Sequence, residues 1–198
     1  MKPINPKLLF LFGLFALSSC VINPTDYNMF KKNFVPFSLE TTFDSTQMII
    51  YREIKAEELT AVIKKNITTI LFLNNISCGG SIQGTRMKIS AYEQIVKEVG
   101  NVAPVYVFSG FSVPNIQTVL DSSNIVENMY FIHHAYGSNI GIMEHNFFKE
   151  LGIELKSDKF RREPLDWAVF QDGVLIQKCH SDFEGVELKQ FLRTLMVR

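Results

Sequence analysis

The sequence lacks the features that most quickly assign a chain to a class of protein. It has only three cysteines among 198 residues, and no two of them have the spacing of zinc ligands, so a disulfide-rich scaffold and a structural zinc site are both excluded. Acidic and basic residues number 20 each, and no basic stripe indicates binding to nucleic acid. A glycine-rich phosphate loop, a serine-hydrolase elbow and a paired-carboxylate motif are also missing. We therefore expect no nucleic-acid partner, no cofactor and no metal ion.

The composition is that of a folded protein. Hydrophobic residues make up 46% of the chain and aromatic residues 12%. The length of 198 residues suits one compact domain with appendages, and the sequence shows no internal repeat.

The first 19 residues have the pattern of a secretory signal peptide. Lys2 and Lys7 place positive charge ahead of the apolar run 8–17. This run is too short for a transmembrane helix, which needs roughly 20 residues. The segment ends in the letters LSSC, of which the last is Cys20. This tetrapeptide resembles the bacterial lipobox, which has an aliphatic residue, two small residues and a cysteine. The alternative is an ordinary secretory signal in which the cysteine falls there by chance.

The lipobox resemblance implies that the chain is cleaved before Cys20 and carries fatty-acyl groups, such as palmitate, on that residue. Two or three acyl chains hold a protein firmly on a membrane, because each buried methylene contributes about 0.8 kcal/mol. The next residue is Val21 and not the aspartate associated with inner-membrane retention in enteric bacteria, which favours the outer membrane where a cell has one. We therefore expect an extracytoplasmic lipoprotein of the cell envelope, in a compartment where thiols can be oxidised.

Residues 20–46 are predicted to form the lipidated N-terminus and a tether. They lack sustained periodicity, and they contain Pro24 and Pro36. Several aromatic residues nevertheless indicate that part of the tether packs on the domain: Tyr27, Phe30, Phe34, Phe37 and Phe43.

From residue 47 to 198, strand and helix patterns alternate. Runs of β-branched and aromatic residues predict strands, and apolar residues at helical spacing predict helices. The expected strands are 47–54, 68–74, 103–110, 128–137, 165–170 and 174–179, the last two joined by the turn Asp172-Gly173. The expected helices are 56–66, 86–100, 113–123, 143–153 and a C-terminal helix opened by a capping box from Ser181 to Glu184. This order predicts an α/β three-layer domain whose parallel sheet gains antiparallel strands from the final hairpin.

Three features of residues 47–198 resemble the thioredoxin-like superfamily, including its redoxin and alkyl hydroperoxide reductase-like branches. The segment TTILFLNNISCGGS, residues 68–81, resembles the strand and loop that present the redox C-x-x-C motif at the start of a helix. Pro164, ahead of LDWAVFQDGVLI, resembles the cis-proline that faces this motif. The hairpin and the capped terminal helix resemble the end of the fold. The resemblance implies a thioredoxin-like three-layer α/β/α sandwich with a mixed central sheet that ends in a β-hairpin and a C-terminal helix.

The resemblance implies a site at Cys78, Ser81 and Pro164, but the sequence departs from the motif. Ser81 stands where the second cysteine would be, so a local disulfide cannot form. Leu71 and Asn75 also replace the proline and threonine of the peroxidase pattern. A thiol at a helix N-terminus is favoured as thiolate, and Ser81 could donate a hydrogen bond to it, although the neighbouring glycines weaken helix formation. Cys78 is therefore either a single-thiol site or a structural or vestigial residue.

The remaining thiol and the histidines have weaker patterns. Cys179 ends a predicted strand, where it is a small buried residue, a thiol that resolves an oxidised Cys78, or one half of a structural disulfide. His133 and His134 are adjacent on a predicted strand, so we expect them to point to opposite faces and not to share a metal ion easily. A site made of His134, Glu144 and His145 is conceivable, but solvated or core-edge histidines are the preferred interpretation.

Two functions follow from these observations. The first is thiol–disulfide redox at the membrane through the single-cysteine C-x-x-S site at Cys78, with a thiol partner. The alternative is a redox-inactive thioredoxin-like module that binds envelope proteins, since a fold does not fix a function. A domain that only displays a surface at the membrane is a third possibility.

Overall fold

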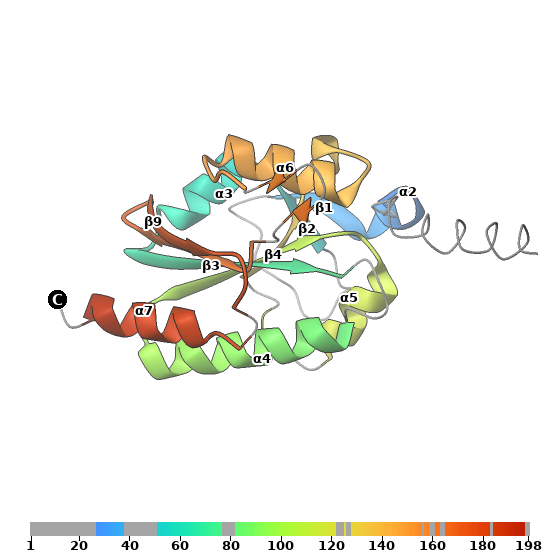
Figure 1. Ribbon diagram of the computed structural model, residues 1–198. Coiled ribbons are helices and arrows are strands. Elements are labelled where there is room, and N and C mark those ends of the chain that lie inside the picture. Colours follow the sequence, from blue (N-terminus) through green and yellow to red (C-terminus); the bar gives the residue numbers. More distant parts are fainter. Residues whose placement is uncertain are drawn as a thin grey trace, which may run out of the picture.

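The computed structural model describes residues 27–37, 51–76, 82–121, 125, 128–155, 157–158, 161–162, 165–182 and 184–196 (Figure 1). The predicted signal peptide and four residues singled out in the sequence lie outside this part of the chain: Cys20, Cys78, Ser81 and Pro164.

The described residues form a seven-stranded mixed sheet in the order β1-β2-β5-β4-β3-β8-β9. The first five strands in this order are parallel to one another. β8 is antiparallel to β3, and β9 is antiparallel to β8. The strands are β1 (Phe34–Pro36), β2 (Tyr51–Ile54), β5 (Met129–Ile132), β4 (Ala103–Ser109), β3 (Thr68–Asn75), β8 (Trp167–Gln171) and β9 (Val174–Cys179). A separate two-stranded sheet pairs β6 (Ser157–Asp158) with β7 (Arg161–Arg162).

Helices cover both faces of the large sheet. Figure 1 shows α3 and α6 on one face and α4, α5 and α7 on the other. The helical elements are α2 (Tyr27–Phe30), η1 (Lys31–Asn33), α3 (Ala56–Ile63), α4 (Ile82–Val99), α5 (Val113–Leu120), η4 (His134–Tyr136), α6 (Ile140–Glu150) and α7 (Val186–Met196). The expected fold class, a three-layer α/β/α sandwich with a mixed central sheet that ends in a hairpin and a C-terminal helix, is confirmed. Among the described helices, none is long and apolar enough to cross a membrane.

Strand β3 lies at the centre of the core, as its continuous apolar run predicts. Ile70, Leu71 and Phe72 are all 0% exposed, because helices cover both faces of this strand. The Phe72 ring stacks on Tyr92 of α4, with centroids 4.2 Å apart, and on Tyr106 of β4, at 5.1 Å. The strand that leads to the predicted thiol loop is therefore rigidly held.

The hairpin at the end of the sheet is also confirmed. Asp172 and Gly173 both have positive φ, 50° and 79°, as a tight hairpin turn of primed type requires. Trp167 of β8 is 1% exposed and belongs to the core, as expected.

Strand β1 lies inside the segment expected to be a tether. It pairs with β2 in parallel, Phe34 opposite Tyr51. Phe34 is 6% exposed and packs edge-on against Phe111 and Phe131, with centroids 4.8 and 5.2 Å away. The expectation that part of this segment packs on the domain is confirmed, and residues 34–36 extend the sheet itself.

The capping of α7 differs from the expected box of Ser181 and Glu184. The Asp182 carboxylate accepts hydrogen bonds from the backbone N–H groups of Glu187 (3.2 Å) and Leu188 (2.9 Å). Asp182 therefore satisfies the free donors at this helix start, and α7 begins at Val186.

Candidate functional site

The carboxyl ends of the parallel strands β2, β5, β4 and β3 lie along one edge of the sheet. In open α/β sheets this edge is where ligand sites are usually built. The predicted thiol loop, residues 77–81, connects β3 to α4 at this edge. Cys78 and Ser81 themselves lie outside the described residues, so the structure defines the frame around the loop.

The end of β3 that leads into the predicted loop is held by side chains of α4 and α5. Thr85 of α4 donates its hydroxyl proton to the Asn75 carbonyl at 3.3 Å. Asn115 of α5 donates its amide N–H to the Ile76 carbonyl at 2.9 Å. The backbone that leaves β3 is thus hydrogen-bonded from two helices immediately before Cys78.

Asn74, the last residue but one of β3, is 2% exposed. Within the described part of the chain, neither its Nδ2 nor its Oδ1 has a hydrogen-bond partner. A buried amide without partners costs about 1–3 kcal/mol, so such a group calls for an explanation.

A buried ion pair lies on the other side of the β3 end. Lys88 Nζ of α4 is 2.7 Å from Asp166 Oδ1, and both side chains are 12% exposed. The same ammonium donates to the Leu73 carbonyl at 3.3 Å, while the Leu73 N–H donates to the Asp166 carbonyl at 3.1 Å. Asp166 follows Pro164 by two residues, so the chain just after this proline runs beside the end of β3. The predicted juxtaposition of Pro164 and Cys78 concerns two residues outside the described part of the chain and remains a prediction.

The ion pair belongs to a polar network that reaches α7. The second Asp166 oxygen accepts the Asp182 N–H at 2.6 Å. The Asp182 carboxylate also accepts the indole N–H of Trp167 at 2.7 Å. This network joins α4, β8 and the start of α7 under the predicted site, and sequence patterns gave no sign of it.

Cys179, at the end of β9, is a free thiol that is half-buried. Its Sγ donates to Glu187 Oε2 at 2.9 Å. Burial raises the pKa of the Cys179 thiol, and the hydrogen bond to Glu187 raises it further. Both effects favour the thiol over the thiolate at this position, and the pairing of Cys179 with Cys78 remains a prediction.

The two histidines do not lie as the sequence predicts. Strand β5 ends at Ile132, His133 caps η4 through its Nδ1, and His134 is the first residue of that turn. Strand alternation therefore does not apply, and the expectation that the two rings point to opposite faces is wrong. The rings stack on each other with centroids 4.4 Å apart.

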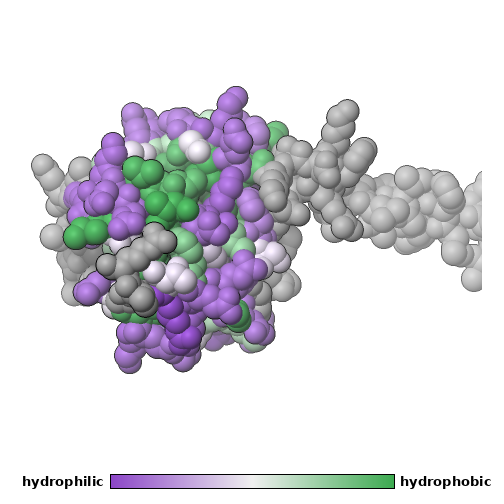
Figure 2. All heavy atoms as spheres, turned by 60° about the vertical axis from the view of Figure 1, so that its left-hand side comes forward, coloured by the Kyte–Doolittle hydropathy of each residue, from purple (hydrophilic) through white to green (hydrophobic). Residues whose placement is uncertain are grey.

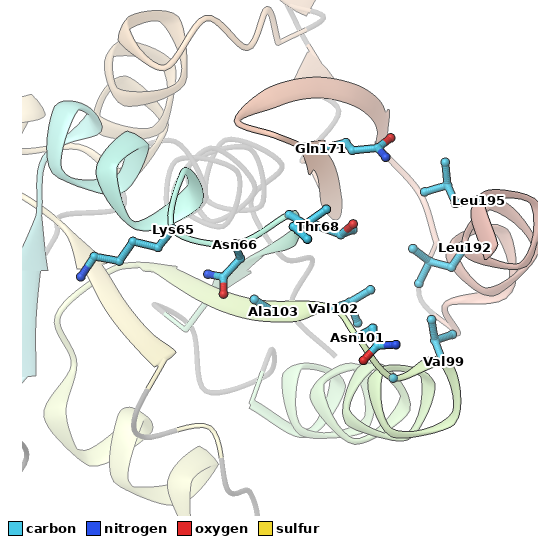
Figure 3. A pocket seen from close by; sticks show the side chains of 12 residues that line it. Lys65, Asn66, Thr68, Val99, Asn101, Val102, Ala103, Gln171, Leu192 and Leu195 are labelled. Carbon is cyan, nitrogen blue, oxygen red and sulfur yellow. The ribbon is translucent and has the colours of Figure 1, made fainter. Parts of the chain in front are cut away.

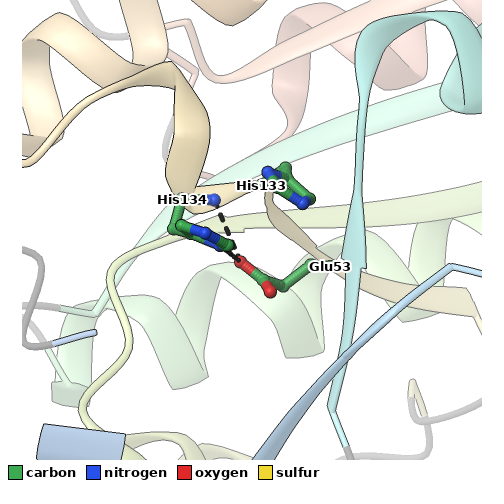
Figure 4. A group of neighbouring side chains, drawn as sticks. All are labelled: Glu53, His133 and His134. Atoms are coloured by element: carbon green, nitrogen blue, oxygen red, sulfur yellow. Dashed lines mark hydrogen bonds and ion pairs between the residues drawn. The ribbon is translucent and has the colours of Figure 1, made fainter. Parts of the chain in front are cut away.

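Glu53 of β2 completes a cluster with these histidines. Its Oε1 accepts hydrogen bonds from the backbone N–H of His134 at 2.9 Å and lies 2.8 Å from its Nδ1 (Figure 4). One ligand atom from each of the three residues lies within 4.8 Å of the other two. The sequence analysis missed Glu53. The signal available in the sequence was strand alternation, which places the Glu53 carboxylate on the same face as Tyr51, which is itself buried.

The N-terminal segment covers this cluster. The Tyr27 ring stacks on His134, with centroids 4.0 Å apart and an angle of 12° between the planes. The Tyr27 hydroxyl lies 3.4 Å from Glu53 Oε2. Burial, followed by the charge of Glu53, raises the pKa of Tyr27. Burial is also the main cause that lowers the pKa of His133, against an opposing effect of Glu53.

The alternative set of His134, Glu144 and His145 is not assembled. Glu144 accepts a hydrogen bond from Ser109 at the end of β4. His145 lines a different cleft with Lys149 and Gly152. Among the described residues, only Glu53, His133 and His134 form a potential metal-binding group.

A larger cleft lies at the opposite edge of the sheet, where β3 and β4 begin (Figure 3). Its volume is about 680 Å³, and its lining includes Thr68, Ala103, Gln171, Leu192 and Leu195. Figure 2 shows hydrophobic side chains gathered on the face that the left-hand side of Figure 1 presents. At this end of the sheet Ile67 is 73% exposed and Val174 64% exposed. The cleft lies at the end of β3 opposite to Asn75, and Lys65 is the one titratable side chain among its described lining residues.

No protein-family model matches the chain, and no curated protein is significantly similar to it. Among solved structures, MTB DsbF is 12% identical to this chain over 65% of this chain and 80% of its own, with a TM-score of 0.41. A thioredoxin-like protein from Bacteroides caccae is 12% identical over 65% of this chain and 40% of its own, with a TM-score of 0.37. Yeast Sco1 is 9% identical over 68% of this chain and 89% of its own, with a TM-score of 0.40. The neighbours are thioredoxin-like proteins; at these scores no property of theirs is carried over to this chain.

Proposed function

We propose that the chain is an extracytoplasmic lipoprotein, anchored in a membrane through Cys20, whose thioredoxin-like domain acts on thiols and disulfides through Cys78. In the sequence Cys78 follows β3, and polar side chains of α4 and α5 bind the described end of this strand. A lipobox-like LSSC segment ahead of Val21 supports the anchor and the location in the cell envelope, with the outer membrane favoured.

The observation that carries the redox part is the buried Lys88–Asp166 pair beside the end of β3. Well-packed hydrophobic residues of similar volume are often as stable as a buried ion pair, or more so. Asn74, buried without a hydrogen-bond partner among the described residues, is a second departure from a well-packed core at the same strand end. Such departures concentrate where function, and not stability, selects the residue.

A single thiol has a defined chemistry at such a site. The Cys78 thiolate attacks one sulfur of a substrate disulfide, a mixed disulfide forms, and the other substrate sulfur leaves as a thiolate. A different thiolate of the substrate, or a thiolate of a partner, then attacks the substrate sulfur of the mixed disulfide and expels the Cys78 thiolate. When the attacking thiolate belongs to the substrate, a new substrate disulfide forms and the isomerisation needs no external oxidant. Ser81 cannot perform this second attack, and the resolving thiol must therefore come from elsewhere.

The alternative is a redox-inactive module that binds envelope proteins. Ser81 at the position of the second cysteine favours it, because a dithiol site would otherwise be expected. The two functions differ in the reactivity of Cys78.

The deciding measurement is the alkylation rate of Cys78 against pH, read for that residue by mass spectrometry. A redox function requires a Cys78 pKa clearly below the ordinary value of about 8.5. It also requires mixed-disulfide adducts in cells that disappear in Cys78→Ala and persist in Cys179→Ser. An ordinary pKa without adducts would leave the binding module as the better proposal.

The anchor is tested separately by Cys20→Ala. We expect this variant to leave the membrane fraction, whereas Cys179→Ser remains there. Tight membrane association of Cys20→Ala would contradict lipidation at this residue.

A further inference from the structure

We propose that Glu53, His133 and His134 form a binding site for a divalent first-row transition-metal ion, with Zn²⁺ as the ion to test first. This inference concerns a cluster at the ends of β2 and β5 and does not depend on the reactivity of Cys78.

The donor set fits this class of metal. Two imidazoles and one carboxylate are ligands that Zn²⁺ and its neighbours in the first row accept. Ca²⁺ takes six to eight oxygen ligands and Mg²⁺ an octahedral shell of oxygens, so a set dominated by nitrogen disfavours both. Three protein ligands also leave one position of a tetrahedral shell for water or a further ligand.

The distances require only a local adjustment. One ligand atom of each residue already lies within 4.8 Å of the other two. Metal–ligand bonds of about 2.1 Å in a tetrahedral arrangement separate the ligands by about 3.4 Å. Rotation of side chains can bring the ligand atoms to this spacing, and the two histidines are the members that can turn because both are only partly buried.

Glu53 is the fixed member of the cluster. It is 2% exposed, whereas glutamate is rarely buried to this degree unless its charge is paired or binds a metal. Its hydrogen-bond partners are the backbone N–H and Nδ1 of His134 and the Tyr27 hydroxyl. The strand pairing of Glu53 with Phe131 of β5 sets its distance from the histidines that follow that strand.

The imidazoles are also oriented for coordination. The rings of Tyr27 and His133 stack on His134, and its Nδ1 lies 2.8 Å from Glu53 Oε1, so a nitrogen and an oxygen donor of the cluster already face each other. His133 Nδ1 accepts the Ala135 N–H at a long 3.2 Å, so a metal ion at this nitrogen would take the place of one weak hydrogen bond. The side chain of His134 is 40% exposed, so an ion can reach the cluster from solvent.

The test is calorimetric titration of the full chain with Zn²⁺, in detergent. Cys78→Ser and Cys179→Ser, with Cys20 alkylated, remove thiolate ligands from the measurement. Co²⁺ in place of Zn²⁺ supplies a spectroscopic check, since nitrogen and oxygen ligands give no thiolate charge-transfer band. We expect one ion per chain, and an affinity lowered at least tenfold in His133→Ala and in His134→Ala.

His145→Ala is the matched control, because His145 lies on α6 outside the cluster. This variant should bind Zn²⁺ with the same affinity as the parent chain. Glu53→Gln keeps the size and the hydrogen-bonding oxygen and should also weaken binding. If that variant does not fold, the two histidine variants decide the matter. Absence of saturable binding, or binding that neither histidine substitution changes, would overturn the proposal.

Discussion

Lys88 and Asp166 form an ion pair between helix α4 and the segment that enters β8, although 78 positions separate them in the sequence. The ammonium and carboxylate are 2.7 Å apart, and each side chain is only 12% exposed. Each group has a second partner, since Lys88 donates to the Leu73 carbonyl and Asp166 accepts the Asp182 N–H. The pair thus joins the end of β3, α4 and the approach to α7 in one network.

Breaking this pair should strongly destabilise the fold. Lys88→Met leaves Asp166 as an uncompensated, largely buried charge, and we expect a loss of about 3 kcal/mol in the free energy of unfolding. Chemical denaturation followed by circular dichroism measures it. Lys189→Met is the matched control, because its pair with Glu98 lies at the surface, with side chains 34% and 39% exposed, and should change stability little. Equal changes in the free energy of unfolding for the two substitutions would show that the Lys88–Asp166 pair stabilises the fold no more than the surface pair does.

Strand β1 makes a second prediction about stability. Phe34→Ala removes a ring that packs against Tyr51, Phe111 and Phe131, so we expect a loss of about 3 kcal/mol in the free energy of unfolding. Val35→Ala, on the same strand but 38% exposed, should cost well under about 1 kcal/mol. Similar small losses for both variants would mean that residues 34–36 behave as a tether in solution.

The contrast between β3 and β1 shows how far the sequence predicts this fold. Residues 68–75 form a strand on local grounds, since a continuous apolar run between turn residues fits a strand covered on both faces. Residues 34–36 form a strand only because β2 is available as a partner, and three residues that include Pro36 carry no periodicity. A pairing that depends on distant residues leaves no local pattern.

The candidate sites show the same limit more sharply. Whether His133 and His134 share a face depends on whether β5 ends before or after His133, and strand ends are the least predictable part of an element. Glu53 and Asp166 become site residues through partners 81 and 78 positions away, which no local motif encodes. The position of Cys78 after a buried strand was readable because that arrangement is local.

Cys179 should be an unreactive thiol at neutral pH, with its pKa raised by burial and by Glu187. The folded chain therefore holds this proton more tightly than the unfolded chain, whose thiol has a pKa of about 8.5. The resulting stabilisation is complete below that value and is lost as the pH rises through the folded pKa. Relative to Cys179→Ala, we expect the parent chain to lose stability in the alkaline range.

Alkylation of Cys179 against pH, read by mass spectrometry, measures the same shift directly. Glu187→Gln keeps a hydrogen-bonding oxygen but removes the charge, so it should move the alkylation profile of Cys179 to lower pH. Rapid alkylation of Cys179 at pH 7 in the parent chain would contradict the raised pKa.

Asn74 gives the prediction that separates stability from function. Its amide is buried and has no hydrogen-bond partner among the described residues, so Asn74→Leu, which is similar in size, should raise the free energy of unfolding by about 1 kcal/mol. Asn115→Ala is the contrasting change, because it removes the hydrogen bond to the Ile76 carbonyl and should lower stability by about the same amount.

If Asn74 is retained for the chemistry of the loop that follows it, the stabilised Asn74→Leu variant should also alkylate more slowly at Cys78 than the parent chain. A gain of stability together with lower thiol reactivity is the trade-off expected when an active site keeps a residue that the fold alone would not select. Asn74→Leu with higher stability and unchanged Cys78 reactivity would separate the buried amide from the thiol. The unpaired polar group would then lose its value as support for a redox function.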